Sequence, residues 1–564
     1  MGEKKINRRD YLKYTGAAIG GLVVGGALGY LAKPAEITEK TVTVTAPGAE
    51  KTVTVTAPST PSVVTLPKIP LLPPGEKNPW LYDRLKGTKL RMLEDTYNGR
   101  ILEWYADLLN KEVGVEIEKA KVIDFALNYS EVLSALETES KDFPLIQTIP
   151  NYLGDWVLRD KLEPLDNYLN MFYGSDEYLM QVMPTYREFY MKWEGKYYGL
   201  PMDGDLHVWA YVAPFYESEK IRSAYKEWHP NRKELTAPPE TWEDWYMQCK
   251  FFAEKVLPDD KTVPGVEVLW PAMVWGAPPW SWSMYYNTAA SMGVNYFDKN
   301  METPLYPQDK AIEALEFWRK LSEYLPEGVE NFGGSETVEF WVEGKAISQI
   351  WWIDINEYGQ RGPLKGLLRN GLMPGYASPE KGKVVHRALM PVGRIWVIPK
   401  YFDEKTKLAA FYCAYHLSHW HYSLASLADS DAGLDPFMYI HYSDIGAYYY
   451  TIPNPYKKPS PEWPSTVSVW PEFEAAKKHL EGGLANMSVG FPQITLVGAF
   501  EYMEALSREV QQVLAGSKSP RDAIKDASAS WIDIRDKYFA EIGRDKYLGM
   551  WRDFYNKMVE LGYI

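Results

Sequence analysis

The feature that most constrains the fold is a regular alternation of short apolar segments and helical stretches, which begins at Lys89. The segments KLRMLE (89–94), VEIEKAKV (115–122) and FPLIQTI (143–149) have the length and apolar content of buried strands. Between them, apolar residues recur at helical spacing over 101–109 and 132–136. Strands that alternate with helices across short loops predict an α/β fold, in which a parallel sheet is covered by helices on both faces.

The loops that follow these strands are the first candidates for a binding site. In open α/β sheets, ligands bind beyond the carboxyl ends of the strands. The loops 95–99 and 150–155 lie at such ends. By position, they offer the polar and aromatic candidates Tyr97, Asn98, Asn151 and Tyr152.

Two helix starts farther along the chain are marked by capping residues. In PPETWEDW (238–245), Thr241 can cap a helix whose third residue is Asp244. In KSPRDAIKDA, Ser519 can cap a helix that continues with Pro520 at the first position and Asp522 at the third.

The N-terminal 33 residues have the pattern of an export signal. Arg8 and Arg9 precede an apolar, glycine-rich run over 15–32, which resembles a twin-arginine signal. A run of this length is short for a membrane span, and an obvious cleavage site is absent from the sequence around it. The segment 1–33 is therefore either a cleaved signal or an uncleaved helix that anchors the protein in the membrane.

A Thr- and Pro-rich segment follows the signal. TVTVTAP occurs at 41–47 and again at 52–58, and prolines continue to Pro79. Such repeats cannot build a core, so we expect 34–87 to be an extended stalk. This places the folded part at the extracellular face of the cell membrane, anchored or secreted. The sequons at Asn128 and Asn486 would then be accessible for glycosylation.

Composition excludes one class of partner and suggests another. The net charge of −14 argues against nucleic acid, because phosphate-backbone binding depends on a basic surface. The 22 Trp and 41 Tyr residues supply many rigid rings of the kind that stack on sugar faces, although most rings in any protein belong to its core.

Four motifs occur in the order found in one known family. They are GKYYGLPMDGDLHVWAYV (195–212), PPETWEDW (238–245), FWVEGKAISQIWWID (340–354) and VLAGSKSPRDAIKDASASW (513–531). The chain thereby resembles the family 1 extracellular solute-binding proteins, the group that contains the maltose-binding proteins, and its N-terminus suggests an archaeal type with a membrane anchor. Residues 347 and 348 depart from the small residue and Met that are usual after Gly-Lys-Ala.

The resemblance implies two lobes that close on a ligand, as in the periplasmic-binding-protein fold. Lobe one would comprise 88–203 and 395–455; lobe two would comprise 204–394 and 456–564, the latter ending in an added C-terminal helix. The implied function is that of a binding component of an ABC importer, with a carbohydrate ligand and the ABC permease and its ATPase as partners. The resemblance implies neither catalytic residues nor a metal or cofactor.

The resemblance also points to residues for the cleft. In the family, the segment that matches FWVEGKAISQI runs into a loop with a stacking Trp, which corresponds to Trp351 or Trp352, beside Asp354. On an extended segment only one of the two rings would face the cleft. The remaining candidates lie in a Gly/Pro-rich loop or at the two crossings between lobes, and they are Trp275, Trp280, Trp282, Asp203, Asp205, Arg394 and Trp396.

Two other functions remain open at this stage. A surface glycoside hydrolase would share the aromatic content and could carry a pair of catalytic carboxylates. A binding protein for a non-sugar solute, such as a peptide, would share the fold.

Cys249 and Cys413 are expected to stay unbridged, because the resemblance puts them in different lobes, which must separate to release a ligand.

Overall fold

The computed structural model describes residues 68–96, 100–259, 262–457, 470 and 472–564. The expected signal, most of the expected stalk, and the candidates Tyr97 and Asn98 lie outside these ranges. Within them, none of the helices combines the length and the apolar content needed to cross a membrane.

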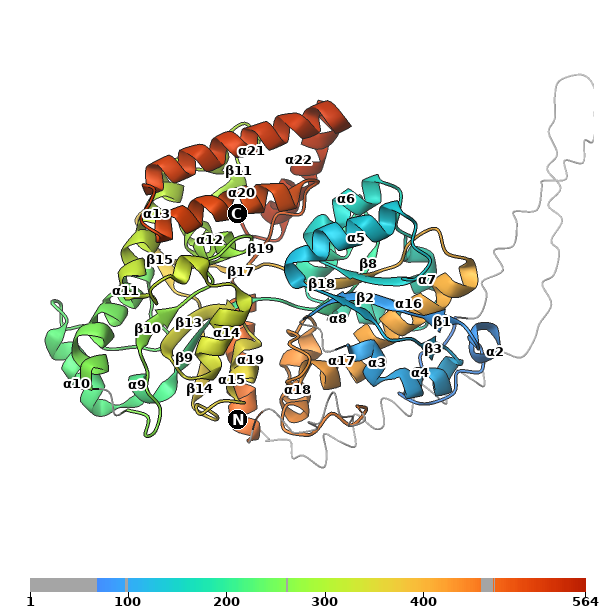
Figure 1. The fold of residues 1–564 in the computed structure, drawn as a ribbon, viewed down its shortest axis with the longest axis horizontal. Helices are drawn as coiled ribbons and strands as arrows, with labels where there is room; N and C mark the ends of the chain where they lie inside the picture. The colour runs from blue at the N-terminus through green and yellow to red at the C-terminus, as the bar shows by residue number, and fades with distance from the viewer. Residues whose placement is uncertain (1–67, 97–99, 260–261, 458–469, 471) are drawn as a thin grey trace, which may run out of the picture. The chain divides into compact units, whose positions relative to one another are not determined.

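The first of two main sheets has five strands in the order β4-β2-β5-β18-β8. Around this sheet is built what we call the first lobe (Figure 1). The strands are β2 (Met92–Asp95), β4 (Lys121–Ile123), β5 (Leu145–Thr148), β8 (Gly199–Asp203) and β18 (Arg394–Val397).

The direction of the strands corrects the expected all-parallel sheet. β2 is parallel to both β4 and β5, as the alternation predicts. β18 is antiparallel to β5 and to β8, so the sheet is mixed. The physical reason is that β18 enters the sheet from the other lobe, whereas β2, β4 and β5 are joined by helices within this one.

Helices cover the first sheet on both faces. α5 packs against β2 and β5, and α16 packs against β8 on the opposite side (Figure 1). The helices of this lobe are α2 (Tyr82–Leu85), α3 (Ile101–Trp104), α4 (Ala106–Val113), α5 (Asn128–Glu137), α6 (Leu153–Leu158), α7 (Asp166–Met171), α8 (Ser175–Gln181), α16 (Glu404–Ser418), α17 (Trp420–Leu427) and α18 (Asp444–Tyr449).

Residues 68–87 belong to this lobe and not to the expected stalk of 34–87. Ile69 forms a parallel β-bridge with Phe172, and the backbone N–H of Gly75 donates to the carboxylate of Glu112 at 2.6 Å. Leu81 and Leu85 are fully buried. The apolar residues of this stretch therefore pack into a core. The many prolines of the stretch had instead indicated an extended stalk.

The second main sheet has four strands in the order β10-β13-β9-β14, and it organises the second lobe. The strands are β9 (His207–Val212), β10 (Trp270–Met273), β13 (Ala346–Trp352) and β14 (Leu368–Gly371). β13 is buried over all seven residues, as suits a strand with neighbours on both sides and helices over its faces.

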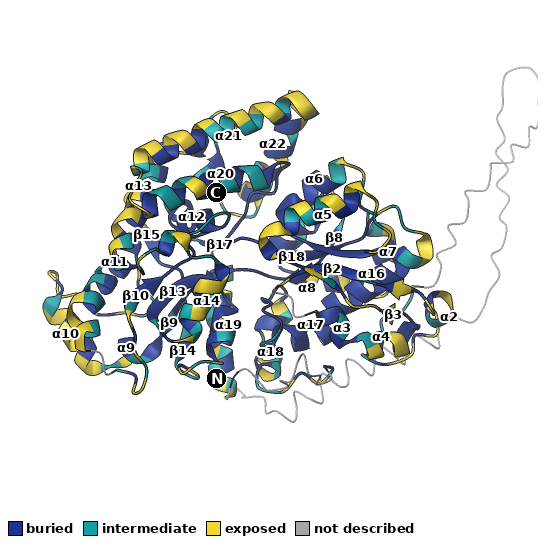
Figure 2. Cartoon of the chain, in the orientation of Figure 1, coloured by how far each residue is buried: buried dark blue, intermediate teal, exposed yellow. Residues whose placement is uncertain are grey.

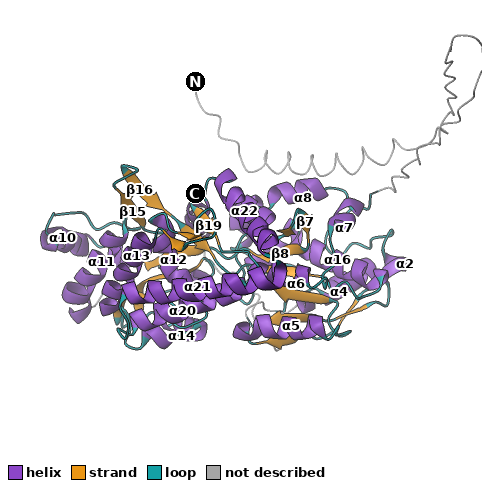
Figure 3. Cartoon of the chain, turned by 90° about the horizontal axis from the view of Figure 1, so that it is seen from above, coloured by secondary structure: helices purple, strands orange, loops and turns teal. Residues whose placement is uncertain are grey.

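The helices of the second lobe include both helices with the expected caps. Thr241 and Asp244 form a capping box at the start of α11, and the Ser519 hydroxyl accepts from Asp522 at the start of α21. α20 and α21 lie side by side (Figure 3). The set is α9 (Ala213–Glu217), α10 (Glu219–Trp228), α11 (Trp242–Phe251), α12 (Ser281–Ser291), α13 (Gln308–Leu321), α14 (Gly334–Val342), α15 (Ile355–Gly359), α19 (Phe473–Met487), α20 (Ala499–Leu514), α21 (Pro520–Ile542) and α22 (Arg544–Glu560).

Five two-stranded pairs complete the regular structure of the described ranges. Four lie apart from the main sheets, and the fifth joins two segments beside the passage between lobes. They are β1 (Lys89–Leu90) with β3 (Glu116–Ile117), β6 (Lys192–Trp193) with β7 (Lys196–Tyr197), β11 (Asn295–Phe297) with β12 (Pro304–Tyr306), β15 (Gly375–Ser378) with β16 (Lys383–His386), and β17 (Ala388–Met390) with β19 (Gly490–Pro492).

Two segments connect the sheets directly. Residues 204–206 join β8 to β9, and residues 391–393 join β17 to β18. Gly204 packs so close to the carbonyl of Pro436 that a Cβ would collide with it. In the other segment Val392 and Gly393 both have left-handed backbone, with φ of 70° and 64°. A β-branched residue rarely adopts this conformation, so the second connection is conformationally strained.

Most aromatic side chains of the described residues are buried in the cores of the two lobes. Figure 2 shows that buried residues form the strands and the inner faces of the helices. Burial also explains two other positions. Asn128 and Asn486 are 1% and 0% exposed, so neither sequon is accessible in the folded chain, contrary to expectation. Cys249 in α11 and Cys413 in α16 are buried, free thiols.

Candidate functional site

A cavity lies where the ends of the two sheets face each other. The space between its lining residues that is free of protein atoms amounts to about 360 Å³, part of which is open to solvent. Its lining combines the first lobe, both connections and the second lobe: Phe125, Asp205, Trp275, Val338, Trp351, Trp352, Asp354, Tyr358, Val392, Arg394 and Gly433.

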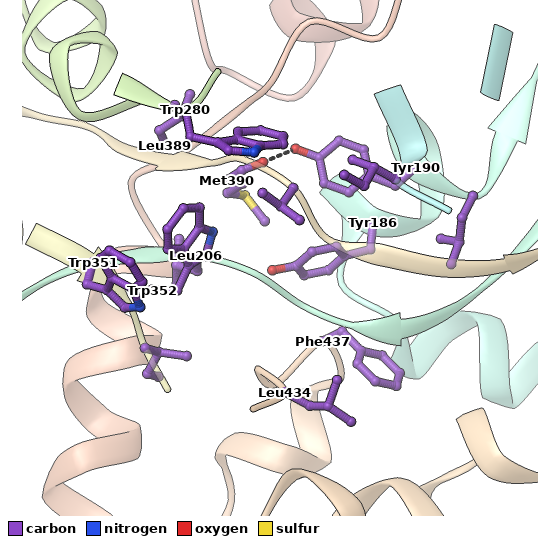
Figure 4. Packing of buried hydrophobic residues seen from close by; sticks show 14 of the residues in the cluster. Tyr186, Tyr190, Leu206, Trp280, Trp351, Trp352, Leu389, Met390, Leu434 and Phe437 are labelled. Carbon is purple, nitrogen blue, oxygen red and sulfur yellow. Dashed lines mark hydrogen bonds between the residues drawn. The ribbon is translucent and has the colours of Figure 1, made fainter. Parts of the chain in front are cut away.

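Three tryptophan rings form an aromatic wall. Trp275 stacks on Trp351 with ring centroids 5.5 Å apart and planes at 17°. Trp352 stands edge-on to Trp351 at 5.0 Å and 83°. Figure 4 shows the rings of Trp351 and Trp352 next to each other. The Trp352 Nε1 donates to the Pro391 carbonyl at 2.9 Å, which fixes the ring against the second connection.

Both Trp351 and Trp352 line the cavity, although strand alternation predicts that only one of them does. The expectation was wrong because β13 ends at Trp352. The last ring of a strand is free to turn towards the edge of the sheet, and here the two rings meet at nearly a right angle.

An aromatic contact joins the lobes at the rim of the cavity. Phe125 follows β4 in the first lobe and stacks on Trp280 of the second, with centroids 5.4 Å apart and planes at 30°. The Arg394 guanidinium lies 5.2 Å from the centre of the Phe125 ring. Ring contacts of this kind contribute about 1 kcal/mol each beyond their buried area.

Arg394 is placed by the register of the first sheet. The amino end of β18 meets the carboxyl ends of β2 and β8, which carry Asp95 and Asp203. Arg394 Nε donates to Asp95 at 3.1 Å, and its Nη1 donates to Asp203 and, at 3.2 Å, to Asp205. One guanidinium group is therefore hydrogen-bonded to three carboxyl groups.

Asp435 was not among the site residues predicted from the sequence. Its hydrogen bonds link the first connection to the second lobe. Its own N–H donates to Asp203 Oδ1 at 2.6 Å. Its Oδ2 accepts from the N–H groups of Leu206 and Ile353 at 3.3 and 3.2 Å. The residue lies in an irregular loop after α17, where the sequence has no pattern that would reveal these contacts.

The cluster has too few positive charges for its carboxyl groups. Burial, and then the charge of Asp203, raises the pKa of Asp354 to about 7. Burial also raises the pKa values of Asp205 and Asp435 well above the usual range, and neighbouring carboxylates add to the effect. Near neutral pH some carboxyl groups of this site therefore remain protonated, unless a positively charged group takes the place of the proton.

Two polar atoms in the lining have no hydrogen-bond partner among the described residues. They are Oδ1 of Asp354, an acceptor when ionised, and Nε1 of Trp275, a donor. Both side chains are at least 93% buried, with exposures of 7%. Buried polar groups are normally paired, so the pair can receive a polar ligand that both donates and accepts hydrogen bonds.

The structure brings together about half of the candidate residues. Those in the cavity lining are Trp275, Trp351, Trp352, Asp354, Asp205 and Arg394. Asp203 holds Arg394 and Trp280 holds Phe125 from just behind the lining.

Four candidates lie elsewhere. Trp282 packs in the core against Tyr286 and Tyr296. Trp396 is 1% exposed, and its Nε1 donates to Met92 Sδ within the first sheet. Asn151 and Tyr152 contact Met503 and Phe500 of α20 and are absent from the described lining.

Five lining residues were not foreseen, and they are Phe125, Val338, Tyr358, Val392 and Gly433. Tyr358 lies one helical turn beyond Asp354, a spacing that could have indicated it. The others lie in segments whose position depends on tertiary contacts. Among the described residues, no group of three or more His, Cys, Asp or Glu side chains could hold a metal ion.

Comparison with known proteins finds a family model that matches the middle of the chain. Residues 143–411 match the family model described as bacterial extracellular solute-binding protein. This confirms the resemblance inferred from the four motifs. No curated protein sequence matches the chain.

Three solved structures with the same fold contain bound ligands. Maltose-bound MalE3 of T. maritima is 15% identical, with a TM-score of 0.59 over 79% of this chain and 100% of that one. A solute-binding protein of Agrobacterium radiobacter in complex with ribitol is 16% identical, with a TM-score of 0.59 over 80% and 99%. The maltotriose-bound MalE domain of Bdellovibrio bacteriovorus is 17% identical, with a TM-score of 0.56 over 79% and 99%. At these identities the likeness establishes a shared two-lobed fold.

Proposed function

Because this chain carries the bacterial extracellular solute-binding domain over residues 143–411, we propose that it captures a carbohydrate and delivers it to an ABC importer. The observation that carries the proposal is the cavity, in which aromatic faces surround an unpaired acceptor and an unpaired donor. A sugar offers apolar faces for stacking, and each hydroxyl can both donate and accept. The ligands bound in these structural relatives are sugars and a polyol, which agrees with this class.

The proposed binding mode is closure of the lobes on the ligand. The lobes would be 88–203 with 395–455, and 204–394 with 456–564, extended by the packed segment 68–87. Trp275, Trp351 and Trp352 would provide the stacking faces, Asp354 and Asp205 would accept from hydroxyls, and Arg394 would hold the aspartates in place. The stack of Phe125 on Trp280 forms across the lobes, so it would stabilise the closed state that the ligand favours.

The proposed location is the outer face of the cell membrane. The family is extracellular or periplasmic, and the Arg8-Arg9 motif would export the chain. The segment 1–33 would either remain as the anchor or be removed. Mass spectrometry of the N-terminal peptide from the native membrane fraction distinguishes these two states.

A thermal-shift screen against mono- and oligosaccharides, polyols and peptides tests the ligand class. We expect carbohydrates or polyols to raise Tm and peptides to leave it unchanged. A peptide as the best ligand would contradict the proposal. Chromatography of the carbohydrate recovered after long incubation should return it intact, and a cleaved product would indicate a hydrolase instead.

A further inference from the structure

We propose that the ligand of this cavity carries a positively charged amino group, which Asp354 receives beside the faces of Trp275 and Trp351. The inference rests on the proposed function, because it specifies which kind of carbohydrate or polyol the site accepts. It depends on three observations: the charge balance of the cluster, the unpaired atoms of the lining, and the aromatic wall.

The charge balance favours a cation. Asp95, Asp203 and Asp205 share the guanidinium of Arg394, whose single charge they already exceed. Asp354 and Asp435 are additional carboxyl groups in the same buried volume. A neutral ligand would leave this excess unchanged, whereas an ammonium group would reduce it by one charge.

Asp354 is the group in the right place to receive the ammonium. It lines the cavity, and its Oδ1 has no hydrogen-bond partner among the described residues. Asp435 also has an oxygen, Oδ1, without a partner among these residues, but its Oδ2 is bonded to the backbone N–H groups of Leu206 and Ile353 and the residue is absent from the described lining. An ammonium adds the attraction of opposite charges to its hydrogen bond with ionised Asp354, whereas a hydroxyl supplies the hydrogen bond alone, so the ammonium is preferred.

The aromatic wall adds a second attraction for a cation. Tryptophan faces attract positive charge more strongly than other rings do, and the effect grows when the pair is shielded from water. Trp275 and Trp351 are 7% and 4% exposed. The same cluster already uses this interaction once, because the Arg394 guanidinium lies over Phe125 at 5.2 Å. The unpaired Nε1 of Trp275 would bind an oxygen of the same ligand.

Without a bound cation, protons neutralise carboxyl groups of the site such as Asp354. Burial and Asp203 raise the pKa of Asp354 to about 7, so the group is mostly protonated at pH 6 and mostly ionised at pH 8. An amine must therefore displace a proton at pH 6 but not at pH 8. The charged and titratable groups that face Asp354 are Asp203 on β8, Asp205 and Asp435 in loops, Arg394 on β18, and Glu357 and Tyr358 on α15.

Two matched pairs of probes test the inference by isothermal titration calorimetry. D-glucamine differs from D-sorbitol by an amino group in place of one hydroxyl, and chitosan disaccharide differs from cellobiose in the same way at each sugar. We expect each amine to bind at least tenfold more tightly than its neutral counterpart at pH 7. D-glucamine, charged at both pH values like other alkylamines, should bind about tenfold more weakly at pH 6 than at pH 8, because only about a tenth of Asp354 is then ionised.

The variant Asp354→Asn keeps the shape of the side chain and removes its charge. We expect it to lower the affinity for D-glucamine at least tenfold and the affinity for D-sorbitol by a smaller factor, so that the preference for the amine is lost. Asp160→Asn is the matched control, since the Asp160 side chain is 80% exposed and pairs with Lys400 at the surface. It should leave both affinities unchanged.

Each result has a definite reading. Neutral probes that bind as tightly as the amines overturn the inference and leave the carbohydrate function intact. Binding of ethanolamine or putrescine, with none of the sugars or polyols bound, supports the cation site and overturns the carbohydrate function. Loss of amine selectivity in Asp160→Asn, or its retention in Asp354→Asn, overturns the assignment to Asp354. Failure of all amine probes to bind overturns the inference as well.

Discussion

Two buried carboxyl groups in this molecule differ in how many hydrogen bonds they receive. Glu112, at the end of α4 in the first lobe, receives hydrogen bonds from four donors. Asp354, which follows β13 in the second lobe, has one oxygen without a partner among the described residues. Both side chains are almost fully removed from water, at 0% and 7% exposed.

The donors of Glu112 come from distant parts of the first lobe. They are the N–H of Gly75 at 2.6 Å, the hydroxyls of Tyr412 and Tyr422 at 3.1 and 2.7 Å, and Nδ1 of His416 at 3.0 Å. Burial alone would raise the pKa of Glu112, but His416 and these hydrogen bonds lower it overall. At Asp354 the charge of Arg394 and a hydrogen bond from Tyr358 oppose the effect of burial only in part, and the pKa rises to about 7.

The difference separates a structural role from a binding role. A buried group whose hydrogen bonds are all formed within the protein stabilises the fold and has no free acceptor for a ligand. A buried polar group that lacks a hydrogen-bond partner destabilises the fold, and proteins retain such a group where function requires it. We therefore assign Glu112 to the fold and Asp354 to the site, and four substitutions test this assignment.

The largest effect is expected at Glu112. Glu112→Ala leaves buried donors of Tyr412, His416 and Tyr422 without their acceptor, which should cost about 3 kcal/mol or more of stability. Because the folded pKa of Glu112 is lowered, its contribution is present above the ordinary carboxyl pKa and is lost as pH falls through the folded value. Urea unfolding measures the loss. Ligand affinity of the folded variant should stay unchanged, and a large loss of affinity would contradict the structural role.

The next effect concerns the aromatic wall. Trp351→Ala removes a stacking face and should weaken binding of the best carbohydrate by about 2 kcal/mol, or roughly 30-fold. Trp282→Phe is the control, because Trp282 packs in the core outside the cavity. It should change stability and leave affinity intact. An affinity for Trp351→Ala within twofold of wild type would show that the ligand does not use this face.

Asp354→Asn should move stability in the direction opposite to Glu112→Ala. The raised pKa means that the ionised group destabilises the fold, and that this cost grows as pH rises from about 4 to about 7. We expect the variant to be more stable than wild type by on the order of 1 kcal/mol at pH 8, with the difference vanishing at pH 4. Thermal unfolding at both pH values is the measurement. Destabilisation at pH 8 would mean that Asp354 is a structural group like Glu112.

The smallest effect is expected at the exposed pair of Asp160 and Lys400. Asp160→Asn should change stability by less than about 0.5 kcal/mol, because solvent screens a surface ion pair. The same unfolding assay provides the reference against which the two buried carboxyl groups are judged. A change as large as that of Glu112→Ala would undermine the argument from burial.

Local patterns predicted much of the fold. The strand and helix alternation located β2, β4, β5 and the helices between them, and capping residues gave the starts of α11 and α21. The expected strands 89–94 and 115–122 are each divided in two, into β1 and β2 and into β3 and β4. The direction of β18 could not be predicted in this way, because it depends on a connection from the other lobe. The packing of 68–87 was hidden for a similar reason, since its partners, such as Phe172 and Glu112, are distant in sequence.

The site was predictable where a motif carried it. The segment ending in Trp351, Trp352 and Asp354, and the aspartates after Gly-Leu-Pro, were found from their motifs. Phe125, Asp435 and Gly433 come from loops placed by tertiary contacts, and no local spacing marks them. Neither does the sequence distinguish Glu112 from Asp354, because the number of donors around a carboxyl group is a property of the folded chain.

A crystal structure of the protein with the carbohydrate or polyol that raises Tm most tests the central claim most directly. The account predicts the ligand in the cavity, stacked on Trp351 or Trp352, with polar atoms within 3.2 Å or so of Asp354 Oδ1 and Trp275 Nε1. A ligand bound elsewhere, or one in the cavity that leaves both of these atoms without a partner, would contradict it.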